Sequence, residues 1–346
     1  MSGLWTKRCG WFLVTLIIGH SSLTINFGGG YYQKHFLMNT IYTIGETVYD
    51  IIFVNGQPEA AKPGGAMLNT AVSLGRLGMH PQLISEFGHD DIGRLIKEFL
   101  TENGVSTNHC YQYSSGQTPV AIALLDYERK ASYTFYRNFP TGRLLIDRPP
   151  FRQGDLVMFG SYFSISPELK APVKRILGCA QDSGCLLFYD PNFRKAHLDE
   201  LEQLREGVVE NLSMANIIRG SDEDFNILFG CQSAEDAHHY CPQAILFYTM
   251  GSGGCTMITP QGDQRHWESI PIDPVSTIGA GDTFNAGLAY GISRENLTFD
   301  TLLHLTPTEW DRVTGTALHM ASAVCMSFDN YISHSLSNFL TDGIEN

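Results

Sequence analysis

The segment 276–287 combines residue types that can bind an anion and move a proton. Gly279, Ala280 and Gly281 predict a sharp turn whose backbone a ligand can approach closely, because glycine has no side chain. Apolar residues at helical spacing follow, so this turn should open a helix and direct free N–H groups at an anion. The carboxylate of Asp282, in the first turn, could then take a proton from a hydroxyl group beside that anion. This combination indicates phosphoryl transfer, although a strand-to-helix connection capped by Asp282 is the alternative.

A second pair of glycines, Gly64 and Gly65, also opens a predicted helix, and Asn69 lies one turn further along it. A small ligand could lie against the backbone of these glycines. Asp50 follows the predicted strand 41–45 in a mostly apolar stretch, where its carboxylate could accept hydrogen bonds from sugar hydroxyl groups. The alternative for the glycines is a structural turn, and for Asp50 a solvent-exposed loop.

Two more candidate groups stand where apolar strands stop. The segment 190–194, which contains Asn192 between an aspartate and an arginine, could handle a metal or a phosphate, although Asp-Pro-Asn is also ordinary turn chemistry. Thr249, Gly251 and Gly254 form a glycine-rich strand end suited to the approach of a nucleotide. The sequence contains neither a GxxxxGK(S/T) loop nor a GxGxxG fingerprint after a strand. This excludes the P-loop and dinucleotide-binding classes.

Alternating strands and helices must position these groups. From residue 38 onward the sequence predicts this alternation, which is typical of an α/β fold with a mainly parallel sheet and helices on both faces. The predicted strands are 41–45, 82–87, 156–160, 186–190, 217–219 and 244–250. The predicted helices are 65–77, 92–103, 168–180, 198–211, 222–229, 282–292 and, last, 309–327. Because ligands of such sheets gather at the carboxyl ends of the strands, we expect the candidate residues to meet there.

One pair of stretches interrupts this rhythm. Residues 118–126 and 131–136 alternate apolar and polar side chains and predict an antiparallel hairpin. We therefore expect a small β-sheet that projects from the main body.

Composition and charge narrow the class of protein. The 346 residues carry a net charge of −13, with a pI near 5.3, which argues against a nucleic-acid partner. The eight cysteines show no CxxC pair and no zinc spacing, so we expect buried thiols in a reducing compartment, the cytoplasm.

The amino terminus differs from the rest of the chain. Lys7 and Arg8 precede an apolar run at 11–18 that resembles the start of a signal peptide and is too short to span a membrane. No small-residue cleavage site follows cleanly. We interpret residues 1–37 as a non-native or signal-like extension, translated from an early start codon, with a true secretory signal as the alternative. We expect no membrane partner.

In this order, the motifs resemble the ribokinase-like (pfkB) carbohydrate kinases over residues 41–332. The segments 64–78 and 88–93 are similar to the amino-terminal signature of that family, and 277–284 is similar to the carboxy-terminal one. Segments 135–138 and 190–194 look most like the fructokinase branch. The resemblance implies a kinase domain over 38–335 whose main sheet carries a small β-sheet lid, formed from about 46–62 and 110–138. It also implies ATP and Mg2+ as cofactors.

The resemblance implies roles for individual residues. The catalytic base would be Asp282, and the anion hole would comprise Gly279, Ala280 and Gly281. The sugar would be held by Asp50, Gly64, Gly65, Asn69 and Arg137. The nucleotide would be bound by Asn192, Ser221, Thr249, Gly251 and Gly254. The metal ligand, through water, would be Asp224.

Two positions depart from the pattern of the family. Its Asn-x-x-Glu element near magnesium is matched here by Ser221 and Asp224, or by Glu223. An acidic residue near a monovalent-cation site in many relatives is replaced by Ser276, so a need for potassium does not follow from the sequence.

The sequence therefore predicts an ATP-dependent sugar kinase, with fructose as the first acceptor to test. Alternative acceptors are ribose, 2-keto-3-deoxygluconate and a nucleoside. A non-catalytic sugar-sensing relative is the alternative outside this class. A homodimer through the lid is a further expectation, because such dimers are common among the relatives.

Overall fold

The computed structural model describes residues 5–8, 11–18, 21–26, 39–125 and 131–342, and it divides into two units, Met1–Asn39 and Thr40–Asn346. The first unit contains a three-stranded antiparallel sheet of β1 (Trp5–Arg8), β2 (Trp11–Ile18) and β3 (Ser21–Asn26). The apolar run that resembles a signal peptide thus forms the central strand, β2.

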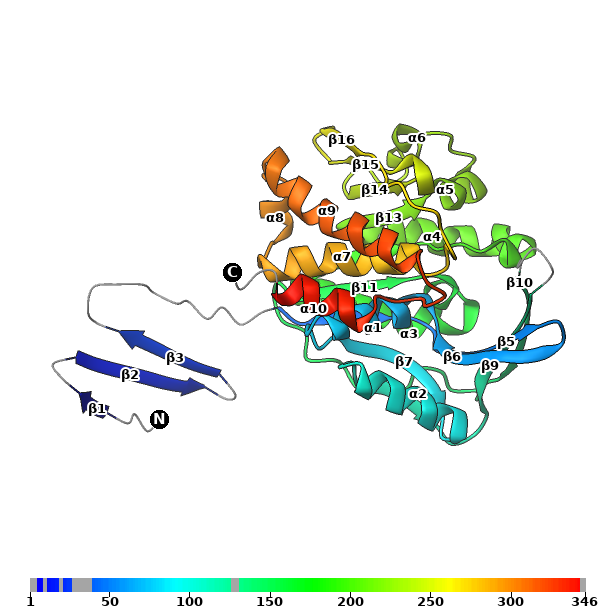
Figure 1. Ribbon diagram of the computed structural model, residues 1–346, viewed down its shortest axis with the longest axis horizontal. Coiled ribbons are helices and arrows are strands. Elements are labelled where there is room, and N and C mark those ends of the chain that lie inside the picture. The colour runs from blue at the N-terminus through cyan, green and yellow to red at the C-terminus, as the bar shows by residue number, and fades with distance from the viewer. Residues whose placement is uncertain (1–4, 9–10, 19–20, 27–38, 126–130, 343–346) are drawn as a thin grey trace. The chain divides into compact units, whose positions relative to one another are not determined.

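The second unit is built on a nine-stranded sheet with the order β16-β15-β14-β13-β12-β11-β4-β7-β8 (Figure 1). Neighbouring strands from β14 through β8 run parallel, and only β15 and β16 at one edge are antiparallel. The strands are β4 (Ile41–Ile44), β7 (Gln82–Gly88), β8 (Ser106–Tyr113), β11 (Leu156–Gly160), β12 (Leu186–Asp190), β13 (Ile217–Ser221), β14 (Ile245–Thr249), β15 (Cys255–Ile258) and β16 (Gln264–Trp267). This confirms the predicted mainly parallel sheet.

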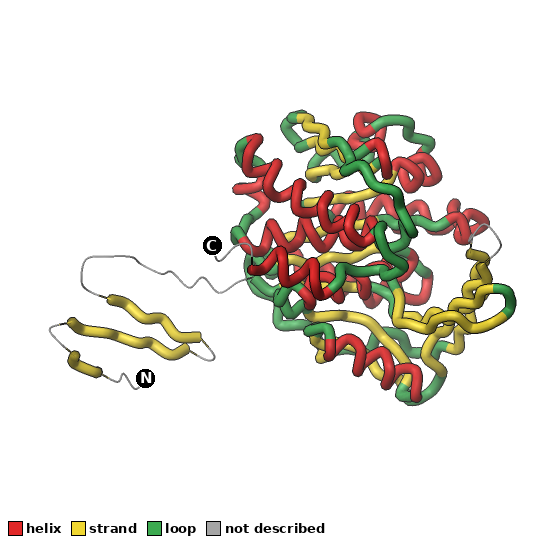
Figure 2. Tube along the Cα trace, in the orientation of Figure 1, coloured by secondary structure: helices red, strands yellow, loops and turns green. Residues whose placement is uncertain are grey.

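Helices cover both faces of this sheet (Figure 2). One face carries α1 (Ala66–Arg76), α2 (Asp91–Glu102), α7 (Ala280–Arg294), α8 (Phe299–Leu302), α9 (Pro307–Val324) and α10 (His334–Asp342). The other carries α3 (Pro167–Asp182), α4 (Leu201–Met214), α5 (Asp222–Phe229) and α6 (Ala234–His238). Short 3-10 helices are η1 (Tyr162–Ser164), η2 (Lys195–Glu200) and η3 (Gly251–Gly253).

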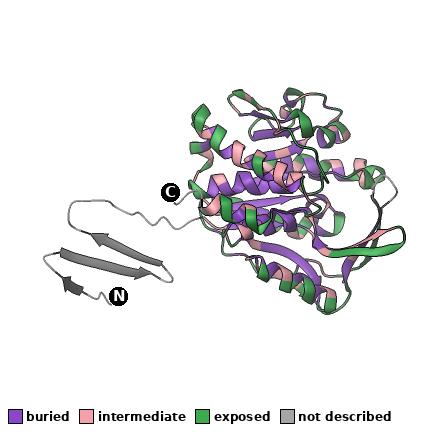
Figure 3. Ribbon diagram, viewed as in Figure 1, coloured by how far each residue is buried: buried purple, intermediate pink, exposed green. Residues whose placement is uncertain are grey.

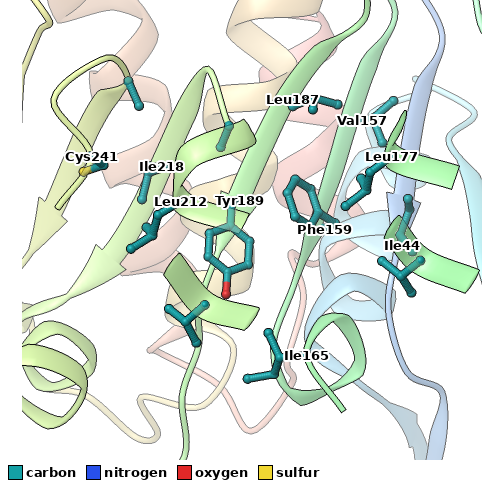
Figure 4. Packing of buried hydrophobic residues seen from close by; sticks show 14 of the residues in the cluster. Ile44, Val157, Phe159, Ile165, Leu177, Leu187, Tyr189, Leu212, Ile218 and Cys241 are labelled. Carbon is teal, nitrogen blue, oxygen red and sulfur yellow. The ribbon is translucent and has the colours of Figure 1, made fainter. Parts of the chain in front are cut away.

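The central strands are mostly apolar because both of their faces are covered. In β11, Leu156 and Met158 pack toward α1 and α7, whereas Val157 and Phe159 pack toward α3 and α4 (Figure 4). Purple, buried residues accordingly fill the sheet and α7 in Figure 3. Helix α7 is buried because α9 lies directly against it, and a side chain at Gly287 would collide with the backbone of Ala317.

A second, four-stranded sheet projects beside the first, with the order β10-β9-β5-β6. Its strands are β5 (Val48–Val54), β6 (Gln57–Gly64), β9 (Gln117–Leu125) and β10 (Ala131–Asn138). The antiparallel pairing of β9 with β10 is as predicted, and the connection 126–130 lies outside the described residues. Residues 110–113, expected in this small sheet, instead end β8 of the large one, because they continue its parallel pairing with β7.

Two helices differ from the sequence-based expectation. The predicted helix 198–211 is a 3-10 turn followed by α4, which runs from Leu201 to Met214. The predicted last helix ends at Val324 and is followed by α10, which was not predicted although Leu336, Phe339 and Leu340 stand at helical spacing. Within the part of the chain that the structure describes, no helix is both long enough and apolar enough to cross a membrane.

Candidate active site

The turn at Gly279 opens α7 as predicted. Gly279 adopts a left-handed backbone conformation with φ of 81°, and a side chain there would collide with the backbone carbonyl of Asn330. Only glycine fits such a position without strain. Helix α7 then begins at Ala280, so its first N–H groups lie in the turn formed by Ala280, Gly281 and Asp282.

The carboxylate of Asp282 is buried and is held by α1. Asn69 donates a hydrogen bond from Nδ2 to Oδ2 of Asp282 at 2.8 Å, and the hydroxyl group of Thr70 donates to the Asp282 backbone carbonyl at 3.0 Å. Burial raises the pKa of Asp282 to about 7, against the lowering effects of the Asn69 hydrogen bond and of Arg194. A carboxylate with a pKa near neutrality is a suitable general base. The contact with Asn69, rather than a cap of its own helix, therefore fixes this side chain.

Arg219 lies directly beneath the turn. It projects from β13, and its guanidinium donates to Oδ2 of Asp190 at 3.2 Å and to Oγ1 of Thr249 at 2.7 Å. A methyl group on Gly281 would lie 2.7 Å from Nη1 of Arg219, so the guanidinium packs against the turn itself. Burial acts to lower the pKa of Arg219, but Asp190, Asp224 and Asp282 together raise it. The site therefore has a permanent buried positive charge.

Asp190 shapes the segment 190–194. Its Oδ2 also accepts from Nδ2 of Asn285 at 2.6 Å, and its Oδ1 accepts from the backbone N–H of Asn192 at 3.0 Å. Asn192 has a positive φ of 39°, which is uncommon outside glycine. These contacts set Asn192 at the carboxyl end of β12, beside α7.

Ser221 and Asp224 form a reciprocal cap at the start of α5. Oδ2 of Asp224 accepts from the backbone N–H and the hydroxyl group of Ser221, at 2.8 and 2.6 Å, and Oδ1 accepts from the backbone N–H of Phe193 at 2.7 Å. Burial and Asp190 raise the pKa of Asp224, whereas Arg219 lowers it. This donor set suits a magnesium ion bound through water and phosphate better than direct coordination. Among the described residues, no group of three or more histidines, cysteines or carboxylates could hold a metal.

Thr249 ends β14, and its hydroxyl group is occupied by Arg219. Gly251 and Gly254 both have positive φ values, 55° and 82°, and a side chain on Gly254 would collide with the backbone carbonyl of Trp267. The turn therefore needs its glycines for structural reasons, and its role toward a nucleotide stays a prediction.

Asp50 and the glycine pair lie together at the base of the small sheet. Asp50 is in strand β5 rather than in a loop after β4, and a side chain on Gly64 would collide with its carboxylate. Burial raises the pKa of Asp50 to about 6, while Lys62 lowers it. Gly65, with φ of 130°, has no room for a side chain against the backbone carbonyl of Glu46.

Arg137 lies elsewhere on the small sheet. Its guanidinium is over the ring of Phe135, 4.5 Å from the ring centre, and it lines an open cavity of about 500 Å³ with Asp90 and Thr118. Among the described residues that line this cavity there is no other predicted sugar-binding residue. Asp282 is not among the residues that line this cavity.

Comparison with known proteins identifies the family of this chain. The family model described as "pfkB family carbohydrate kinase" matches residues 38–305. The chain belongs to this family. Among curated relatives, this pfkB kinase is 29% identical over 274 residues to aminoimidazole riboside kinase of Salmonella typhimurium, covering 77% of this chain and 85% of the relative. It is 26% identical over 279 residues to fructokinase-1 of Oryza sativa subsp. japonica, covering 78% and 83%.

Solved structures share the fold of this pfkB kinase. Fructokinase from Vibrio cholerae O395, in fructose, ADP and calcium ion bound form, matches with a TM-score of 0.73 and 24% identity, covering 86% of this chain and 96% of that one. Aminoimidazole riboside kinase from Salmonella enterica, complexed with aminoimidazole riboside and an ATP analogue, matches with a TM-score of 0.73 and 21% identity, covering 88% and 100%.

Two residues of the pfkB kinase site were missed in the sequence. Arg219 stands within an apolar strand, and Asn285 stands on the same face of α7 as Asp282 in an otherwise small or apolar run. A charged or amide side chain inside a buried element needs a hydrogen-bond partner, and this requirement could have marked both residues as site candidates. Both side chains bind Asp190.

Proposed function

We propose that this protein transfers the γ-phosphoryl group of ATP to a hydroxyl group of a monosaccharide, with fructose as the first candidate. The observation that carries the proposal is the buried Asp282, with its pKa raised to about 7, directly after the glycine turn of α7. Membership of the pfkB family and the fructokinases among its relatives support the same reaction.

Asp282 accepts the proton of the attacking sugar hydroxyl group in the proposed reaction. The backbone N–H groups of Gly279, Ala280 and Gly281 at the start of α7 stabilise the negative charge on the transferred phosphoryl group, once the Ala280 N–H is released from the Thr277 carbonyl, which it meets at 3.3 Å. Arg219 adds a fixed positive charge behind this turn. Mg2+, which enters with ATP, would neutralise phosphate charge near Asp224 and Asn192. These roles are proposals that rest on the contacts described above.

The proposed sugar-binding residues are Asp50, Gly64, Gly65 and Asn69. Oδ1 of Asn69 is buried and has no hydrogen-bond partner in the part of the chain that the structure describes, so it retains an acceptor for a ligand hydroxyl group. Both glycines allow close packing, because Asp50 and the carbonyl of Glu46 occupy the space where side chains at 64 and 65 would lie. Arg137 would have to reach the sugar by movement of the small sheet, in keeping with its proposed role as a lid.

The nucleotide would bind at the carboxyl ends of β12, β13 and β14, where Asn192, Ser221 and Thr249 lie. Gly251 and Gly254 would line the same site. We also infer a kinase domain over 38–335, a cytoplasmic location and a homodimer through the small sheet.

The acceptor can be identified with a coupled assay of ADP release. Purified protein with Mg-ATP is supplied in turn with fructose, ribose, 2-keto-3-deoxygluconate, adenosine and aminoimidazole riboside, the last because its kinase is among the relatives. We expect the highest kcat/KM with fructose. If another acceptor is preferred, fructose specificity is wrong but the kinase proposal holds. If no acceptor is turned over while one of them raises the Tm, the protein is a sugar sensor.

The rate should depend on pH through two buried carboxylates. Since Asp282 must be ionised to accept a proton and its pKa is about 7, kcat/KM should fall about tenfold per pH unit below 7. Below about pH 6, protonation of Asp50 should steepen the fall. The measurement is kcat/KM for the sugar from pH 5 to 9 at saturating Mg-ATP, with protein stability checked at each pH. A flat profile between pH 5.5 and 8 would contradict the role of Asp282.

A further inference from the structure

Lys62 joins the small sheet to a loop of the main body. It lies on β6, and its Nζ donates to the backbone carbonyl of Phe328 at 2.7 Å and to Oδ1 of Asn330 at 3.1 Å. The side chain is half-buried. Nothing in the proposed reaction uses this amine, although it spans two segments 266 residues apart in the sequence.

The loop that receives Lys62 packs against the anion turn. Asn330 is buried, and its backbone touches Gly279 so closely that no side chain fits there. The same loop is tied to the residues before the turn, because the backbone N–H groups of Val275 and Ser276 both donate to the carbonyl of Cys325, at 2.8 and 3.2 Å. The position of this loop therefore helps to set the position of the turn.

The other side of Lys62 faces the proposed sugar-binding carboxylate. Asp50 is directly opposite Lys62 in the antiparallel register of β5 and β6, so both side chains lie on one face of the small sheet. Burial lowers the pKa of Lys62, whereas the charges of Asp329 and Asp50 raise it. The ammonium group is thus placed between Asp50 and the loop behind the anion turn.

We propose that Lys62 is a positioning residue that holds the strand pair carrying Asp50 at a fixed distance from the anion turn of α7. The inference rests on the proposed sugar-kinase function, in which the two ends of the site must meet across the sugar. An ammonium group suits this task because it has three donors, and here two of them meet oxygen atoms of the loop. Its long stem lets the ammonium group reach from β6 to the loop.

Removing the ammonium group should lower kcat more than it weakens ATP binding. Lys62→Met keeps the length of the side chain and should reduce kcat by about tenfold to 100-fold, because small displacements of reacting groups are costly. The KM for ATP and the Tm should stay close to those of the unaltered protein. Lys62→Arg should retain most of the activity, and Lys62→Ala should recover part of its lost kcat in methylammonium. Lys97→Met, at an exposed lysine of α2, is the control and should have no effect.

Hydrogen exchange gives a second readout that needs no turnover. Amides of 279–283 and 325–330 should exchange faster in Lys62→Met than in the unaltered protein and in Lys97→Met. If the unaltered protein phosphorylates no acceptor, the proposed function fails, and the exchange comparison alone then decides the role of Lys62. Unchanged exchange in both segments overturns the proposal. A kcat of Lys62→Met within about twofold of the unaltered enzyme also overturns it, as does a loss of kcat in Lys62→Ala that methylammonium does not relieve.

Discussion

Asp282→Asn is expected to lower kcat by about 10²- to 10⁴-fold while sugar binding is largely retained, because the amide has the shape of the carboxylate but cannot accept a proton. The oxygen of the new amide can still accept the hydrogen bond from Asn69. The measurements are kcat by ADP release and the sugar Kd by titration calorimetry. The control is Asp300→Asn, at an exposed aspartate in the first turn of α8. An unchanged kcat would remove Asp282 from the proposed mechanism.

The same substitution should stabilise the fold above neutral pH. Burial raises the pKa of Asp282 from 3.8 to about 7, so ionisation of the folded protein is unfavourable by about 4 kcal/mol at most. The contribution of the neutral carboxyl group to the free energy of unfolding is therefore complete below about pH 4 and is lost as the pH rises through 7. The Asp282→Asn variant avoids this loss, because its amide stays neutral at every pH. Its free energy of unfolding should exceed that of the unaltered protein at pH 8, and the difference should shrink at pH 4.

Arg219→Met should be the most destabilising single change in the site. It removes the cation that faces Asp190 and Asp224 and leaves buried carboxylates without their partner, which typically costs about 3 to 5 kcal/mol. Arg219 also lowers the pKa of Asp282, so the acid limb of the rate profile should move to higher pH in the variant. Urea unfolding and the pH dependence of kcat/KM measure the two effects.

Two control variants sharpen this prediction. Arg219→Lys keeps the charge but not the forked geometry that reaches Asp190 and Thr249 together, so it should fall between Arg219→Met and the unaltered protein. Arg94→Met removes an exposed arginine that pairs with Glu98 on α2 and should change stability by less than about 1 kcal/mol. If Arg219→Met and Arg94→Met had equal free energies of unfolding, the charge of Arg219 would not stabilise the fold.

The regular elements were largely predictable from local pattern. Strand 156–160 is a continuous apolar run and strand 186–190 is apolar up to Asp190, as a sheet that buries both faces of its strands requires. Helix ends were less predictable, since the predicted helix 198–211 begins as the 3-10 turn η2 and continues as α4 to Met214. Helix α10 was missed although Leu336, Phe339 and Leu340 stand at the spacing of one helix face.

The candidate site was predictable only in part. The anion turn could be found from its glycines, because a positive φ and a close backbone contact both demand glycine at 279. The position of Arg137 could not be predicted, because its motif does not determine how the small sheet is placed against the large one. Arg219 shows the complementary limit, because the strand pattern does not say that its guanidinium points beneath Gly281.

The sequence by itself determined the α/β class, the order of its elements, the family signatures and the type of chemistry at Asp282. These depend on local spacing, on glycine conformations and on the functional groups that the side chains carry. Only the tertiary structure decided that Asn69 binds Asp282, 213 residues away, that Arg219 supports the turn, and that Lys62 bridges the small sheet and the loop behind the turn. Contacts between residues so far apart depend on how elements pack, and burial in that packing is also what raises the pKa of Asp282 to about 7.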